Sequence, residues 1–143
     1  MQILEELSRN LFGMNYQVYL GEIHFVCSQD LNIENKVRLG LNAKDVIIGN
    51  TRGESKESVI NDIRDKILHE GDLGSHPSRK NRTEVELLTD KYAKHLDDMI
   101  SENSLIVGFW FIEGHPAYPV WWDYSYLIED RQQNILLIGS SSD

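Results

Sequence analysis

The sequence predicts an α+β fold, in which a mainly antiparallel sheet with a C-terminal three-strand meander packs against about three helices. Apolar residues recur at helical spacing in residues 2–12, 56–70 and 83–101. The C-terminal third consists instead of short apolar segments separated by turns, which is typical of an antiparallel meander. The order helix, strands, two helices, strands is that of an α+β protein. A length of 143 residues predicts a single domain, covering residues 1–143.

The first third of the chain predicts one helix followed by strands. Leu4, Leu7 and Leu11 lie on one face of the predicted helix 2–12, and Gly13 follows as a stop signal. Residues 16–27 alternate in a way that predicts a strand, with a possible bulge at Gly21. Residues 30–35 are rich in turn formers, and residues 36–41 and 45–48 are short strand candidates.

Two helices are predicted in the middle of the chain. Ser55 is a suitable N-cap for the helix 56–70, and Gly71 is a suitable stop. Residues 71–82 have no apolar periodicity and predict a loop. Thr83 is expected to cap the second helix, because Glu86 follows three residues later as a capping box requires.

The C-terminal third predicts three strands. Residues 105–112 are apolar at successive positions, which is typical of an interior strand. Residues 119–128 form a second strand rich in aromatic residues, and residues 135–138 form a third. Residues 139–143 form a polar tail, and its serines, residues 140–142, are expected to be disordered.

Composition disfavours several classes of partner. The chain has 14 basic and 23 acidic residues, a formal charge of −9, which repels nucleic-acid phosphates and anionic membranes. No window approaches the roughly 18 apolar residues of a membrane span, and the acidic N-terminus does not resemble a secretory signal. We therefore expect a cytoplasmic protein. Cys27 is the only cysteine, so neither an internal disulfide nor a multi-cysteine zinc site is expected. No motif indicates a cofactor or metal.

Charge and aromatic residues are unevenly distributed. Residues 101–143 contain six acidic residues and one basic residue, a net charge of −5. The same segment holds eight of the 13 aromatic residues, including all three tryptophans. Aromatic residues are enriched at the centres of protein interfaces, and carboxylates beside them favour a basic partner. This region is therefore the candidate interface.

The two faces of the strand 120–128 differ in character. One face is uniformly apolar or aromatic and is expected to face the core; it contains Val120, Trp122, Tyr124, Tyr126 and Ile128. The other face carries Trp121 and Asp123 together with Ser125 and Leu127. Two interpretations remain open. If that face is exposed, Trp121 and Asp123 anchor a protein partner; if helices cover both faces, Trp121 is a core residue.

The first functional hypothesis is a small acidic binding protein that neutralises or regulates a basic protein partner. Its concrete version is an immunity protein that blocks a toxin nuclease, since bacterial immunity proteins are often small, acidic, cytoplasmic and free of catalytic motifs. Metal ligands and catalytic residues are not assigned. The candidate binding residues are Glu113, His115, Tyr118, Trp121, Asp123, Glu129 and Asp130.

Two alternatives come from other classes. A small enzyme could place an acid–base site at His115, with Asp123 and Tyr118 beside it, although a histidine before a proline is also a common turn residue. A self-associating structural or regulatory subunit could pair through an exposed edge strand at residues 135–138. The chain is accordingly expected to be a monomer or a homodimer.

Overall fold

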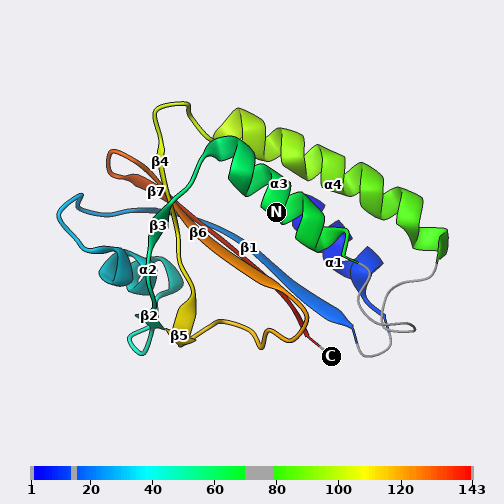
Figure 1. Ribbon diagram of the computed structural model, residues 1–143, viewed down its shortest axis with the longest axis horizontal. Helices are drawn as coiled ribbons and strands as arrows, with labels where there is room; N and C mark the ends of the chain where they lie inside the picture. Colours follow the sequence, from blue (N-terminus) through cyan, green and yellow to red (C-terminus); the bar gives the residue numbers. More distant parts are fainter. Residues whose placement is uncertain (1, 14–15, 70–78, 143) are drawn as a thin grey trace.

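The computed structural model describes residues 2–13, 16–69 and 79–142 and confirms the α+β fold (Figure 1). Within these residues the helices are α1 (Gln2–Leu11), α2 (Ile33–Leu41), α3 (Lys56–Ile67) and α4 (Arg79–Met99). The strands are β1 (Gln17–Val26), β2 (Ile47–Ile48), β3 (Arg52–Gly53), β4 (Leu105–Gly108), β5 (Phe111–Glu113), β6 (Asp123–Asp130) and β7 (Gln133–Ser142).

The main sheet is antiparallel and has the strand order β1-β7-β6-β4-β3. The strands β4, β6 and β7 lie side by side in chain order, as the predicted meander requires. The predicted strand 105–112 is interrupted, however. Phe109 and Trp110 separate β4 from β5, and β5 leaves the main sheet to pair with β2 in a two-stranded ribbon. The β2–β5 ribbon is thus a separate layer.

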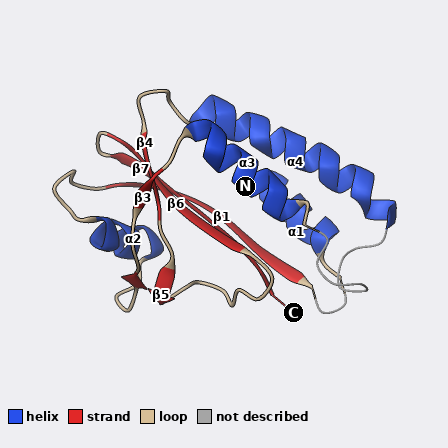
Figure 2. Ribbon diagram, in the orientation of Figure 1, coloured by secondary structure: helices blue, strands red, loops and turns tan. Residues whose placement is uncertain are grey.

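Three helices cover one face of the main sheet, and the view in Figure 2 shows them packed together along one side of it. Ser55 caps α3 as predicted, its side chain accepting a hydrogen bond from the Ser58 N–H. The core on this face consists of buried leucines and isoleucines of α1, α3 and α4 packed against aromatic residues of β6. Its largest members include Leu7, Leu11, Ile63, Ile67, Leu88, Tyr92, Leu96, Tyr124 and Tyr126.

The opposite face of the sheet is covered by α2 and the β2–β5 ribbon. The prediction of a strand at residues 36–41 is wrong, because these residues belong to the helix α2. Asn32 caps the N-terminus of α2, and Asn42 ends it in the left-handed conformation. Ile33, Val37 and Leu41 recur every four residues and pack into the second core. Gly40 lets α2 approach the sheet, because a Cβ there would lie 2.6 Å from a side-chain carbon of Leu136.

The C-terminal tail also differs from its prediction. Residues 139–142 are not disordered; they belong to β7, which pairs with β1 on one side and β6 on the other. Ser140 and Ser141 are buried, and the Ser141 hydroxyl accepts a hydrogen bond from the Trp122 N–H. Because β7 lies inside the sheet, residues 135–138 are not an edge strand, and self-association through them is excluded by the topology.

The second long helix begins earlier than predicted. It starts at Arg79, so Thr83 is an exposed residue inside the helix rather than its cap. The predicted loop 71–82 is correspondingly shortened. Its residues 71–78, and the proposed stop at Gly71, lie outside the described residues, as does Asp143. The predicted bulge at Gly21 is absent, because β1 pairs with β7 in one uninterrupted register.

We predict that Gly139→Ala destabilises the protein by about 2 kcal/mol, the usual cost of overpacking a core. A Cβ at this position would lie 2.2 Å from the ring of Tyr124, which is itself buried. The matched control is Gly53→Ala, where no atom lies within 4 Å of the added carbon. Urea unfolding of both variants measures the difference, and equal stabilities would contradict the tight packing of β7 on Tyr124.

Candidate functional site

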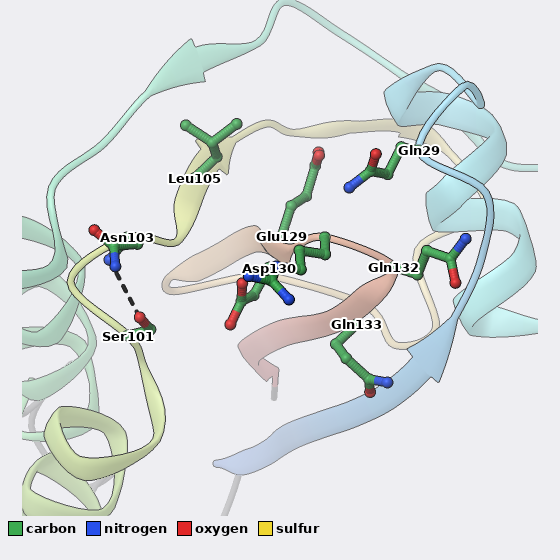
Figure 3. Close-up of a pocket in the computed structure, with 9 residues that line it drawn as sticks. Gln29, Ser101, Asn103, Leu105, Glu129, Asp130, Gln132 and Gln133 are labelled. Atoms are coloured by element: carbon green, nitrogen blue, oxygen red, sulfur yellow. Dashed lines mark hydrogen bonds between the residues drawn. The ribbon is translucent and has the colours of Figure 1, made fainter.

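An open groove of about 1150 Å³ lies at the tip of the β6–β7 hairpin. Figure 3 shows that the hairpin contributes its floor, while the segment after α4 and the segment after β1 border it. Its lining is polar, with amide, carboxylate and hydroxyl groups, one guanidinium and one exposed leucine: Gln29, Ser101, Asn103, Leu105, Glu129, Asp130, Arg131, Gln132 and Gln133. Two of the predicted binding residues, Glu129 and Asp130, therefore belong to this hairpin groove.

The geometry of the hairpin determines how its carboxylates are presented. Asp130 pairs with Gln133, so the connection consists of two residues, and Arg131 adopts the left-handed conformation at φ 60°. Successive residues of a strand point to opposite faces of the sheet. Glu129 and Asp130 consequently diverge, as Figure 3 shows. They are not arranged to act together on one bond, as a catalytic carboxylate pair would.

A buried ion pair fixes one of these carboxylates. The Lys36 ammonium of α2 lies 3.0 Å from a carboxylate oxygen of Glu129, and the Lys36 side chain is only 4% exposed. This pair ties α2 to the hairpin and neutralises the charge of Glu129. Asp130 is exposed, and its carboxylate has no ion pair or hydrogen bond within the described part of the chain. Asp130 is therefore the carboxylate that remains available to a ligand in the groove.

The other predicted binding residues lie at the opposite end of β6. An eight-residue strand is roughly 23 Å long, so the groove and the start of β6 are separate surfaces. Glu113 is exposed on β5, and Tyr118, in the following loop, is 80% exposed. Trp121 and Asp123 are partly buried, and Trp121 packs against the helix-side core. The structure does not assemble the seven predicted residues into one surface.

The predicted alternation of the strand 120–128 does not extend to Trp121, because β6 begins at Asp123 and Trp121 packs against the helix-side core. Ser125 and Leu127, which share a face of β6 with Asp123, are buried. The Ser125 hydroxyl donates a hydrogen bond to the backbone oxygen of Phe109, and Leu127 packs in the second core. Trp121 and Asp123 are therefore both partly buried and are not neighbours on one exposed face of β6.

His115 is held in the loop that follows β5. Its Nδ1 accepts a hydrogen bond of 2.9 Å from the Ala117 N–H, so the neutral ring carries its proton on Nε2. The ring packs edge-on against Phe111. Burial lowers the pKa of the His115 imidazole, and the negative charge of Asp123 partly opposes this shift. His115 does not line the hairpin groove.

A polar cluster between β1 and α4 was not anticipated from the sequence. The Glu22 carboxylate is 5% exposed and lies 3.0 Å from Nε2 of both His24 and His95. The Tyr92 hydroxyl donates to the same carboxylate at 3.3 Å. Glu22 and His95 are far apart in the chain, so spacing offers no signal for this contact. The only local hint is an acidic residue inside an apolar strand.

Comparisons of the chain with protein-family models, with curated proteins and with solved structures find no match. None of the described helices is both long and apolar enough to cross a membrane. Within residues 2–13, 16–69 and 79–142, no group of three or more histidine, cysteine or acidic residues is placed to hold a metal ion.

We predict that His115 titrates below about 6.5, the ordinary imidazole value. Burial disfavours its charged form, so its folded-state pKa is lower than its unfolded-state pKa. As the pH falls below the ordinary value, the unfolded chain takes up this proton first, and His115 then reduces the free energy of unfolding. An NMR titration of the ring nitrogens measures both the midpoint and the Nε2-protonated form. A midpoint at or above the ordinary value would contradict the prediction.

We predict that Glu129→Gln lowers the free energy of unfolding by about 3 kcal/mol, because it leaves the buried Lys36 ammonium without a counter-charge. The double variant Lys36→Met with Glu129→Gln should recover most of this loss. Asp90→Asn is the control, since it breaks an exposed pair with Arg64 and should cost less than about 1 kcal/mol. Denaturant unfolding at neutral pH distinguishes these cases. Equal effects of Glu129→Gln and Asp90→Asn would contradict a buried pair.

Proposed function

We propose that this chain is a binding protein that recognises a basic segment of a protein partner in the hairpin groove. The observation that carries the proposal is the exposed Asp130 carboxylate, which forms no ion pair with the described residues and lies in a groove lined mainly by amides, with Arg131 as its one cation. A carboxylate of this kind favours the guanidinium of arginine or the ammonium of lysine. Leu105 is 68% exposed at the edge of the groove and offers an apolar contact for the same segment.

The distribution of charge supports a basic partner. The whole chain carries −9, and the C-terminal third, which contributes most of the groove, carries −5. An acidic surface steers a cationic partner during diffusional encounter and discriminates against acidic ones. The groove also presents side-chain amides, including Gln29, Asn103 and Gln132, which can donate to and accept from the backbone of an extended segment.

The concrete version of the proposal is an immunity protein that acts in the cytoplasm and blocks a toxin nuclease. A nuclease binds phosphates through a basic surface, and an acidic protein can occupy that surface by presenting carboxylates in place of phosphates. Small size and negative charge are the features that this chain shares with such inhibitors. This is an analogy of general character and rests on no sequence match.

The groove supports binding rather than acid–base catalysis. Its lining residues include no imidazole or thiol, and its two carboxylates diverge. The one hydroxyl, of Ser101, accepts a hydrogen bond from the Asn103 N–H and has no base beside it among the groove residues. His115, on which the enzymatic alternative depended, lies outside the groove.

We predict that Asp130→Lys weakens binding of a basic partner by about tenfold or more, because it places a cation where the partner's cation would bind. Candidate partners are the products of the adjacent genes, first tested by pull-down and then measured by titration calorimetry. The matched control is Glu84→Lys, the same change of charge at an exposed position near the start of α4, at the other end of the molecule (Figure 1). Full affinity of Asp130→Lys would remove the groove from the interface, and failure of every basic product to bind would contradict the function.

A further inference from the structure

The strand β1 forms one edge of the main sheet and is long for an edge strand. Its ten residues pair with β7 in a continuous register from Gln17 to Val26. No strand lies on its other side within the described residues. Every second residue of an edge strand directs its N–H and C=O groups outward. Within the described residues, these outward N–H and C=O groups of β1 have no hydrogen-bond partner.

Several of the usual protections of an edge strand are missing from β1, although Glu22 is an inward-pointing charge. Its sequence contains no proline, lysine or arginine, and its pairing has no bulge. The opposite edge of the same sheet is different, because β3 has only two residues and one of them is Arg52. A short, charged edge resists pairing with another chain, whereas a long and regular one is a template for it.

The free edge opens into a groove whose wall is α1. One stretch is lined by residues 20–23 of β1 together with Leu4, Ser8 and Arg9 of α1. A second stretch is lined by Gln17 and Val18 together with Phe12, and it shares Ser8 and Arg9 with the first. The two stretches therefore form one channel along the strand.

We propose that a second copy of this chain docks here through its own β1, forming an antiparallel homodimer about a two-fold axis at Ile23. In that register Glu22 lies opposite His24 of the second copy, and the reverse pair forms at the same time. Leu20 lies opposite Val26 of the second copy, and Gly21 lies opposite Phe25. The two sheets join into one, with the helix-covered faces on the same side.

Charge complementarity selects this register and a second copy as the occupant. Directly opposed residues of an antiparallel pair have Cβ atoms about 5 Å apart, so Glu22 and His24 of the second copy are in contact range. An axis at Glu22 would instead oppose two carboxylates, and an axis at Gly21 would oppose Glu22 with Leu20. Only the axis at Ile23 gives two carboxylate–imidazole pairs from a single strand sequence.

The exposure of side chains on β1 also supports pairing with a second copy. The His24 side chain is 56% exposed in its contact with Glu22, so it can turn toward the second copy without leaving a core position. Val26 is 60% exposed at the end of the strand and would be covered by Leu20 of the second copy. This interface is separate from the hairpin groove and does not depend on the function proposed for it.

Sedimentation equilibrium of the full chain over a concentration series tests the proposal. The wild-type chain should be a dimer, and Val26→Lys should weaken dimerisation by about tenfold or more, because it places a charge opposite Leu20. Leu87→Lys is the matched control, since Leu87 is comparably exposed but lies on α4, and this variant should remain dimeric. Circular dichroism of each variant verifies that it is folded.

A second variant tests the register. His24→Glu opposes two carboxylates in the proposed pairing and should dissociate the dimer, whereas a dimer of another register would tolerate it. A monomeric wild-type chain at every concentration would overturn the homodimer and leave the edge to a strand of a different protein. A dimer that survives both Val26→Lys and His24→Glu would overturn β1 as the interface.

Discussion

The fold depends on the double-sided burial of the two central strands, β6 and β7. Leu136, Leu137 and Ile138 are adjacent in β7 and completely buried, so apolar side chains project from both faces of the sheet. Each face must therefore be covered. The helices α1, α3 and α4 cover one face, and α2 with the β2–β5 ribbon covers the other. Burial of apolar surface is the dominant favourable term in folding. The helices and the ribbon contribute to it by covering the two apolar faces of the sheet.

This constraint also determines where recognition surfaces can form. Side chains in the middle of β6 are buried in the two cores, so a ligand can reach the strand only at its ends. One end carries the hairpin groove, where Glu129 is held by Lys36 and Asp130 is exposed. The free edge of β1 is the other accessible part of the sheet. The proposed partner site and the proposed dimer interface are thus at the periphery of one rigid, doubly covered sheet.

Local sequence signals predicted some elements well and others wrongly, for identifiable reasons. The helices at residues 2–12 and 56–70 have clear apolar stripes and stop or cap signals, and both were predicted close to their actual bounds. The helix α2 was missed because Val37, Leu39 and Leu41 alternate with other residues as in a strand. Gly40 lowers the intrinsic helix propensity of the segment, but it allows the close approach of α2 to Leu136. The serine-rich end of β7 lacked apolar residues, and only pairing with β1 and β6 makes it a strand.

By itself, the sequence determined the α+β class, the acidity of the chain and the concentration of charge and aromatic residues in the C-terminal third. These properties follow from composition and from local periodicity, which require no knowledge of distant contacts. Tertiary structure alone decided which of those residues meet. It packed Trp121 against the helix-side core and paired Glu129 with Lys36, 93 positions away. It also left Asp130 exposed beside a groove. Such outcomes depend on how two sheet faces are covered, and no short stretch of sequence encodes that choice.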